Sequence, residues 1–392
     1  MTTPKRQTAV RAMYMRGGTS KGVFFTPEDL PAAVRGDAAA RDRFMLRVIG
    51  SPDPYGKQID GMGGATSSTS KVVLVGRSER PDCDVDYLFG AVAIEQPVVD
   101  WSGNCGNLTS AVGPFAIHRG LVDAPRDGVA VVRIWQANIG RRIIAHVPMR
   151  DGEVDELGDF ELDGVTFPAA EIKLEFLDPG DGEGEGGAMF PTGRRIDRLE
   201  VPGVGSIEAT LINAGNPAVF VDAQALGLAG SELQDEINGN AELLQRLETI
   251  RAHATVAMGL VATPEEATAT RPHTPKLAFF APPAPYTASS GKPIAAGDVD
   301  ILARIMSMGK LHHAMTGTGA VAIAVAAAIP GTVVSRVLGG QGRGQITFGH
   351  PSGKLFVGAE AMERDGEWQV TKAVMSRSAR RLMDGHILVP ID

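Results

Sequence analysis

The sequence predicts an α+β protein in which strands dominate and enclose two short apolar helices. Glycine and proline, at 48 and 25 residues, divide the chain into short strand-like segments. Residues 105–119 and 319–329 have helical patterns but are apolar on nearly every face, so both helices must be covered on all sides. Each helix follows a glycine-containing turn, at 103–107 and 315–319, in corresponding places of the two halves. This correspondence predicts a weak internal repeat with pseudo-twofold symmetry.

The remaining elements follow from local patterns along the chain. Apolar runs bounded by turn residues predict strands, and apolar residues at helical spacing predict helices. We expect strands at 71–75, 129–135, 142–147 and 345–348, and helices at 38–49, 105–119, 231–258, 291–308 and 319–329. The acidic, glycine-rich stretch 178–187 is typical of a solvated loop at a domain boundary. Residues 338–344 have the glycines of a nucleotide-binding loop, but a strand follows them instead of a helix, so we interpret them as a hairpin turn.

Composition and charge restrict the class of protein. A chain of 392 residues, 43% apolar and 21% charged, is long enough for two soluble domains. Its only cysteines, Cys83 and Cys105, argue against a disulfide framework and favour a reducing compartment. The longest apolar run, 320–330, is far shorter than the roughly 20 residues that span a bilayer, and residues 1–7 lack the apolar core of a secretory signal. We therefore expect a cytoplasmic location and no membrane partner. The net charge of −8, without a basic run, argues against nucleic acid.

We interpret two segments as the two halves of one active site. Residues 60–71 and 101–107 are rich in small residues, and each presents a group suited to proton transfer, Lys71 and Cys105 respectively. The alternative for Lys71 is a surface lysine at the start of a strand. The alternative for Cys105 is that it is only a small residue buried in the core, as free cysteines usually are. We interpret Cys83 in that way.

Further candidate residues surround an expected anion site. Two helix N-termini that face one cleft would direct unpaired N–H groups and positive dipole ends at the same point. The turn at 16–20 contains glycines that permit close backbone approach and hydroxyls that can donate, although it is also compatible with a plain turn between strands. Lys310 begins a stretch with His312 and His313 that is suited equally to holding a carboxylate or to decorating a helix end. The two histidines are adjacent rather than one helical turn apart, which argues against a metal site.

Three motifs resemble the signatures of the diaminopimelate epimerase-like fold. They are an Asn-Cys-Gly-Asn string that opens the first apolar helix, an Asn-Ala-Gly-Asn-Pro string before a strand, and a Thr-Gly-Thr-Gly-Ala string that opens the second, at 104–107, 213–217 and 316–320. The resemblance implies two similar domains, each a β-barrel wrapped around a central helix, with the active site between them. The expected domains are residues 1–187, joined by the returning segment 378–392, and residues 188–377.

Longer strings resemble one branch of this fold, the PrpF family of 2-methylaconitate isomerases. They recur from one end of the chain to the other, at 15–25, 50–64, 190–193 and 376–385. The resemblance implies cis–trans isomerisation of 2-methylaconitate in propionate breakdown through the methylcitrate cycle, alongside an aconitase-like dehydratase and with no cofactor. One alternative is an allylic isomerase or tautomerase of another unsaturated tricarboxylate, such as 4-oxalomesaconate. Another is an accessory protein of the dehydratase. A homo-oligomer is compatible with the sequence.

The resemblance also assigns roles to individual residues. Amino-acid epimerases of this fold use two cysteines, and here Thr316 stands where the second cysteine would be, so two-base epimerisation is not expected. Lys71 is then the expected base, with Cys105 as the acid or as a donor to the carbanion. A free lysine has a pKa of about 10.4, so the base must be desolvated or lie near other cations. The expected substrate-binding residues are Arg16, Thr19, Ser20, Gly64, Gly106, Asn107, Lys310, Thr316, Gly317 and Thr318.

Overall fold

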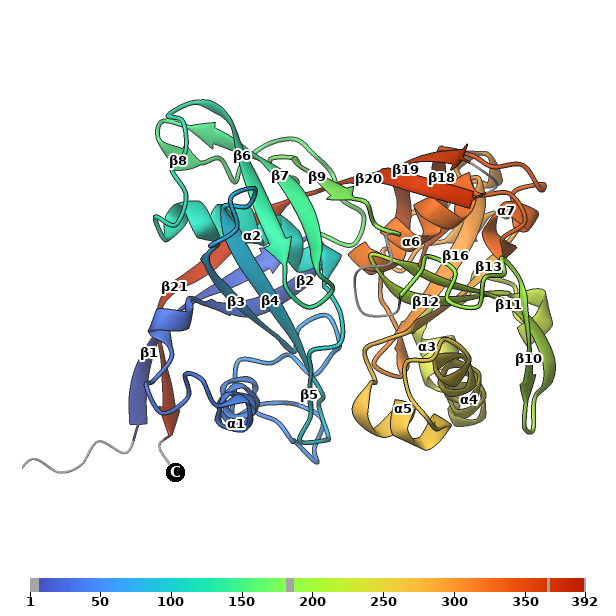
Figure 1. Ribbon diagram of the computed structural model, residues 1–392, viewed down its shortest axis with the longest axis horizontal. Coiled ribbons are helices and arrows are strands. Elements are labelled where there is room, and N and C mark those ends of the chain that lie inside the picture. The colour runs from blue at the N-terminus through green and yellow to red at the C-terminus, as the bar shows by residue number, and fades with distance from the viewer. Residues whose placement is uncertain (1–6, 181–186, 365–366, 391–392) are drawn as a thin grey trace, which may run out of the picture.

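A computed structural model describes residues 7–180, 187–364 and 367–390. Over these residues the fold is α+β, with one large, mostly antiparallel sheet of 19 strands, a two-stranded ribbon and few helices. The strands gather into two groups, one around α2 and one around α6, as Figure 1 shows. Strands therefore dominate, as predicted. Residues 181–186 of the expected acidic loop lie outside the described residues.

The first group of strands surrounds α2. Its order follows the pairings β21–β1–β2–β3–β4–β6–β7–β9, in which β2–β3 and β4–β6 are parallel and the others antiparallel. The elements are β1 (Gln7–Gly17), β2 (Ser20–Phe25), η1 (Pro27–Asp29), α1 (Ala38–Ile49), β3 (Lys71–Arg77), β4 (Val85–Val92), β5 (Val99–Asp100), α2 (Gly106–His118), β6 (Gly128–Gln136), β7 (Arg141–Arg150), β8 (Glu153–Val154) and β9 (Ile172–Leu177).

The second group surrounds α6, and a layer of helices, α3 to α5, covers its outer side (Figure 1). Its strands pair in the order β10–β11–β12–β13–β16–β18–β19–β20, with β12–β13 and β16–β18 parallel. The elements are β10 (Asp197–Val201), β11 (Gly205–Ala214), β12 (Asn216–Asp222), η2 (Gln224–Leu226), α3 (Gln234–Asn238), α4 (Ala241–Ala257), α5 (Pro264–Thr270), β13 (Lys276–Ala281), β14 (Tyr286–Thr287), β15 (Pro293–Ile294), η3 (Ala296–Asp298), β16 (Ile301–Ser307), β17 (Lys310–Leu311), α6 (Gly317–Ala328), α7 (Val333–Val337), β18 (Gln345–His350), β19 (Gly353–Arg364), β20 (Glu367–Arg377) and β21 (Ala379–Pro390).

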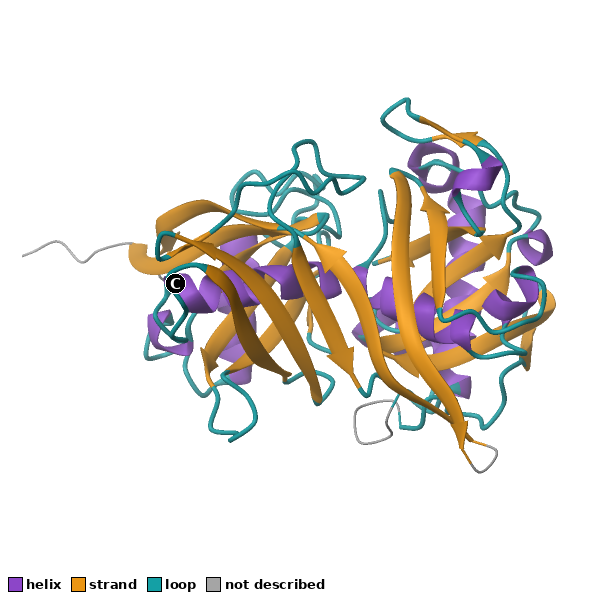
Figure 2. Cartoon of the chain, turned by 90° about the horizontal axis from the view of Figure 1, so that it is seen from above, coloured by secondary structure: helices purple, strands orange, loops and turns teal. Residues whose placement is uncertain are grey.

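The last two strands connect the groups. β20 pairs with β19 of the second group and with β9 of the first, and β21 then runs antiparallel to β1 along its length. Figure 2 shows long strands passing between the two halves of the molecule. The end of the chain is thus part of the first group, and Arg377 and Ser378, where β20 gives way to β21, lie beside the N-terminus of α2.

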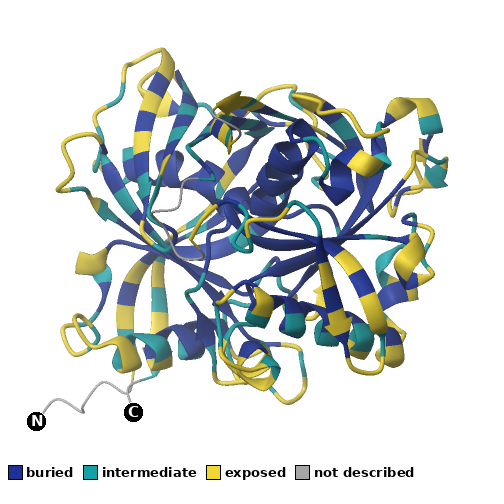
Figure 3. Ribbon diagram, turned by 45° about the vertical axis from the view of Figure 1, so that its right-hand side comes forward, coloured by how far each residue is buried: buried dark blue, intermediate teal, exposed yellow. Residues whose placement is uncertain are grey.

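The two central helices are buried as their sequences predict. Every residue of α6 is buried, and in α2 only the last two residues are partly exposed. Most side chains of α6 are alanine or valine, so neighbouring strands can approach it from all sides. Figure 3 shows interior helices that are wholly buried, whereas the outer strands alternate buried and exposed residues. No helix within the described ranges is long and apolar enough to cross a membrane.

Three local predictions differ from the structure. The expected helix at 231–258 is divided into α3 and α4, because Asn240 caps α4 by accepting a hydrogen bond from Leu243 N. The expected helix at 291–308 is wrong: β15, η3 and β16 occupy it, and β16 is buried on both faces, so its apolar residues do not alternate with exposed polar ones. Residues 338–344 do not form a hairpin turn, because they join α7 to β18.

Candidate active site

Lys71 and Cys105 lie side by side in the interior. Lys71 is the first residue of β3, Cys105 is the N-cap of α2, and Lys71 Nζ is 3.4 Å from Cys105 Sγ. Lys71 and Cys105 are each only 5% exposed. The ammonium also lies 5.1 Å from the centre of the Phe89 ring. A lysine and a thiol in contact at this depth form a pair that can exchange a proton without passing it through bulk water.

The turn before Lys71 is held by a glutamine that sequence reasoning did not identify. Gln58 Oε1 accepts hydrogen bonds from Ala65 N at 2.8 Å and from Ser70 Oγ at 2.7 Å. The amide nitrogen of Gln58 donates to Ser51 Oγ. Gly64 packs under the same turn, where an added Cβ would stand 2.7 Å from Thr69 Oγ1. Gln58 and Gly64 therefore shape the approach to β3.

The N-termini of α2 and α6 meet directly. A Cβ on Gly106 would lie 2.7 Å from the carbonyl carbon of Gly317, so the two backbones touch and only glycine fits. Thr316 is the N-cap of α6, and its hydroxyl accepts a hydrogen bond from Gly319 N. On the other side, the carbonyl of Cys105 accepts hydrogen bonds from the hydroxyls of Thr109 and Tyr87. The positive ends of both helix dipoles thus converge beside Cys105.

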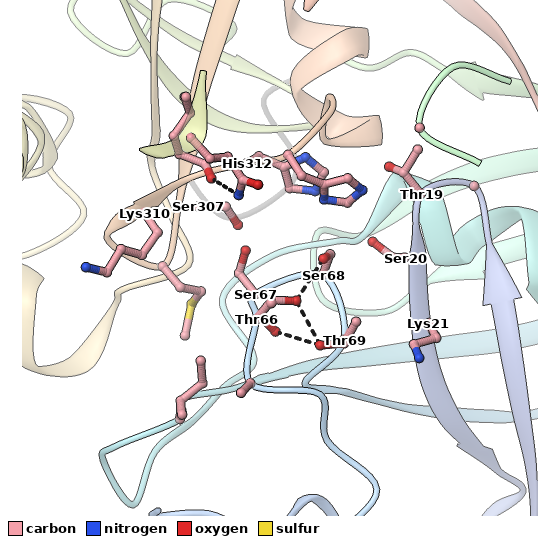
Figure 4. A pocket seen from close by; sticks show the side chains of 18 of the residues that line it. Thr19, Ser20, Lys21, Thr66, Ser67, Ser68, Thr69, Ser307, Lys310 and His312 are labelled. Carbon is pink, nitrogen blue, oxygen red and sulfur yellow. Dashed lines mark hydrogen bonds between the residues drawn. The ribbon is translucent and has the colours of Figure 1, made fainter. Parts of the chain in front are cut away.

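A cavity of about 1390 Å³ opens next to this pair. In Figure 4 the hydroxyl-rich turn Thr66 to Thr69 lies between Ser20 and Lys21 on one side and Ser307 on the other. Basic residues of the lining are Arg16, Lys21, Lys310 and Arg380, and the acidic ones are Glu95, Glu156 and Glu248. Two of those acids have basic partners of their own, His118 for Glu156 and Arg251 for Glu248. The cavity therefore offers cations and hydroxyls to an anionic ligand.

The lining of this cavity includes two histidines but not the catalytic candidates. Lys71 and Cys105 do not line it, whereas His312 and His313 do. Burial and the charges of neighbouring groups, Lys71 among them, lower the pKa of both histidines. His312 Nδ1 accepts a hydrogen bond from Ala314 N, as a neutral ring does. The two rings stack at 4.7 Å. Among the described residues, no group of three His, Cys, Asp or Glu side chains is placed to hold a metal ion.

Residues 7–390 match the family described as PrpF protein. The chain belongs to the PrpF family. It is 63% identical to a 2-methyl-aconitate isomerase from Shewanella oneidensis and 62% identical to one from Cupriavidus necator, and each match covers 98% of both proteins. A solved structure of a methylitaconate-delta-isomerase superposes with a TM-score of 0.74 at 39% identity, over 98% of this chain and 97% of the other.

The fold class extends beyond the PrpF family. A hydroxyproline epimerase from Agrobacterium vitis superposes with a TM-score of 0.56 at 13% identity, over 100% of this chain and 94% of the other. At this level of identity the likeness shows the fold alone. The mixed α+β architecture of this PrpF-family chain is thus that of the racemases and epimerases, which agrees with the fold class expected from its helix-opening motifs.

Several predicted site residues of this PrpF-family chain bind other parts of the protein. Asn107 Nδ2 donates to Thr19 Oγ1 and to Met315 O, while its Oδ1 accepts from Arg377 Nε. One nitrogen of Arg16 donates to the carbonyls of Gly18 and Ser378 and to the Ser378 hydroxyl. Their side chains hold the turn after β1 against the ends of α2 and β20, in addition to any contact with substrate.

Other predicted residues either have a buried hydroxyl without a hydrogen-bond partner or are exposed to solvent. Ser20 Oγ and Thr318 Oγ1 are buried, and neither has a hydrogen-bond partner in the described structure. A buried hydroxyl without a partner costs free energy, which a bound ligand recovers by supplying the partner. Lys310 is exposed on the cavity rim.

No local sequence pattern indicates that a second lysine is buried near the pair. Lys276 begins β13, and burial, followed by the charge of Lys71, lowers the pKa of its ammonium to about 7. The neighbouring residues 272–275 have the proline and threonine content of an ordinary turn. Only the pairing of β13 with β12 and β16 brings Lys276 inward.

Proposed function

We propose that this chain is a cis–trans isomerase of 2-methylaconitate that works by proton abstraction and return, with Lys71 as the base. The observation that carries the proposal is the 3.4 Å contact of Lys71 Nζ with Cys105 Sγ beside a cavity of cations and hydroxyls. The names of two relatives that are 63% and 62% identical to this chain support the same substrate.

The first step requires neutral Lys71. A proton transfer within the pair, from the ammonium to the Cys105 thiolate, yields an amine and a thiol without a net change of charge. The amine then takes a proton from the substrate CH2: the C–H bond breaks, its electron pair spreads over the diene and a carboxylate, and Lys71 becomes an ammonium. The former double bond is now effectively single, so the skeleton rotates. Return of a proton from Cys105 or Lys71 fixes the other isomer.

The carbanion needs positive charge that is already in place. The converging N-termini of α2 and α6 supply partial positive charge, and the unpartnered hydroxyls of Ser20 and Thr318 supply donors. Arg16, Lys21 and Lys310 supply full charges around the cavity for the three carboxylates. In this proposal Gly106 and Gly317 contribute backbone N–H groups, since they have no side chains.

The proposal includes the domain organisation. Residues 1–187 with the returning segment 378–392 would form one domain and residues 188–377 the other, each a β-barrel around its central helix. This division is supported by the packing of α2 against β1, β2 and β7 and of α6 against β11, β18 and β19. We also propose that the enzyme works alongside an aconitase-like dehydratase, because that chemistry consumes or supplies aconitate-type acids.

Proton NMR in heavy water tests the function. The purified enzyme is incubated with 2-methylaconitate and, separately, with 4-oxalomesaconate. We expect interconversion of the 2-methylaconitate isomers with incorporation of deuterium, and no conversion by Lys71→Ala. The matched control is Lys354→Met, which changes an exposed lysine of β19. Turnover of oxalomesaconate alone would transfer the assignment to that acid. Absence of exchange with both acids would favour an accessory role. Near-normal turnover by Lys71→Ala would show that Lys71 is not the base.

A further inference from the structure

Lys276 reaches the active site from the half of the chain opposite to Lys71. It is fully buried on β13, and its ammonium donates to the carbonyl of His273 at 3.1 Å and contacts His273 Nδ1 at 3.3 Å. Within the described ranges no carboxylate forms an ion pair with it. Such a lysine is costly to bury, and the cost is concentrated on its charged form.

His273 connects Lys276 to the turn that presents Cys105. His273 Nε2 lies 3.3 Å from the carbonyl oxygen of Asn104, the residue before Cys105, so that nitrogen carries the proton. Its Nδ1 therefore has a lone pair to accept from Lys276. Burial, followed by the charge of Lys276, lowers the pKa of His273 well below its usual value, which keeps the ring neutral. The backbone N–H of His273 donates to Asp100 at 2.7 Å, which fixes the segment.

The surroundings of Lys276 contain both signs of charge. The titratable and charged groups that face it are Lys71 of β3, Cys105 at the start of α2, Asp100 of β5, Arg251 of α4, His273 of its own segment and His312 after β17. Arg251 is paired with Glu248 at 2.6 Å, so its charge is compensated. Of the two other cations, Lys71 lowers the pKa of Lys276 more than Arg251 does.

We propose that Lys276 is a positioning residue that, through its charge and its contact with His273, lowers the pH at which the Lys71–Cys105 pair loses its first proton and so gives the singly protonated pair from which neutral Lys71 forms. Two ammonium groups buried around one thiol repel each other, so protonation of one amine opposes protonation of the other. The second half of the chain thus contributes a cation from β13, while Thr316 stands where an epimerase would have its second cysteine. This inference rests on the proposed function for its kinetic test, but its thiol test needs no substrate.

The kinetic test compares the pH dependence of kcat/KM in the native enzyme and in Lys276→Met, which keeps an apolar stem of similar length. Removal of the like charge lets the Lys71–Cys105 pair keep both of its protons to higher pH, so we expect the acidic limb to move up by one unit or more. Lys354→Met serves as control and leaves the limb in place. A uniform loss of rate with an unmoved limb would show a merely structural role and would overturn the proposal.

The thiol test follows the rate of Cys105 alkylation by iodoacetamide against pH, in a Cys83→Ser background that leaves one thiol. We expect the midpoint to move to higher pH in Lys276→Met. An unmoved midpoint contradicts the proposal even if the substrate assignment fails. Should Lys276→Met not fold, ¹³Cε lysine NMR of the native enzyme decides. One lysine signal, absent from Lys276→Arg, should titrate near neutral pH, and titration of every lysine above pH 9 would reject the idea.

Discussion

Lys71 Nζ and Cys105 Sγ are 3.4 Å apart although 34 residues separate them in the chain, and strand β3 and helix α2 deliver them from different directions. Neither of these two side chains makes another hydrogen bond in the part of the chain that the structure describes. Each is therefore the other's main polar partner. A change at one alters the protonation of both, which makes their substitutions informative together.

Cys105→Ser should lower kcat about 100-fold and leave KM nearly unchanged, because a serine hydroxyl is too weak an acid to share a proton with Lys71. Steady-state kinetics measure both constants, and Cys105→Ala separates proton transfer from space filling. Cys83→Ser is the matched control. Cys83 lies near the surface ion pairs that Asp82 and Asp84 form with arginines, and it has no role in the proposed mechanism. Near-normal kcat in Cys105→Ala would show that Cys105 takes no part in proton transfer.

Gly106→Ala should disrupt the contact of the two central helices. The new Cβ would lie 2.7 Å from the backbone carbon of Gly317, and backbone cannot rotate away as a side chain can. We expect a loss of about 3 kcal/mol in the free energy of unfolding, at the upper end for overpacking, and at least a tenfold loss of activity. Denaturant unfolding and kinetics measure these effects. Gly297→Ala, which meets no atom within 4 Å, should change neither.

Arg377→Lys should loosen the turn that contains Thr19. Arg377 is fully buried, and its Nε donates to Asn107 Oδ1 at 2.9 Å while Asn107 Nδ2 donates to Thr19. A lysine cannot reproduce the rigid fork, so the Asn107 oxygen loses its donor at a cost of about 2 kcal/mol. We expect that loss in the free energy of unfolding and a rise in KM, since the turn lines the cavity. Arg364→Lys, on the exposed end of β19, is the control; an unchanged KM would contradict the coupling.

The sequence predicts elements whose signals are local. α1 is found at 38–49 as expected, because Asp37 caps it by accepting from Ala40 N and Gly50 ends it in a left-handed conformation. α2 and α6 were recognisable because no surface helix is apolar on every side. β16 was mistaken for a helix for the same physical reason, since a strand buried on both faces shows no alternation of polar residues.

The site is predicted only in part, because most of it is assembled by long-range pairing. Lys71 and Cys105 are distinguished by their small-residue surroundings and by the family resemblance. The structure places their side chains in contact, and their catalytic roles stay a prediction. Lys276 lies in ordinary strand sequence, and nothing local distinguishes it from the surface lysines of other strands. Arg377 lies in the family-like string 376–385, but that string does not indicate that the side chain is buried. Their burial follows from which strands become neighbours, such as β9 with β20.

Acid should destabilise the protein through its buried neutral histidines. Burial, followed by the charges of Arg304 and Arg377, lowers the pKa of His350 to about 3, and His350 Nδ1 accepts a hydrogen bond from Ser352 N. An unfolded histidine has a pKa of about 6.5. Between these two values the unfolded chain binds the extra proton, so the free energy of unfolding falls as the pH falls through this window.

From His350 alone we expect a loss of about 2–3 kcal/mol between pH 7 and pH 4.5. His350→Gln should flatten the dependence by about that amount, because glutamine can still accept from Ser352 N but cannot take up a proton. Denaturant unfolding at a series of pH values measures the slope. His253→Gln, at a partly exposed position of α4, is the matched control and should keep the native slope. An equal slope in the native protein and in His350→Gln would mean that His350 is not buried in its neutral form.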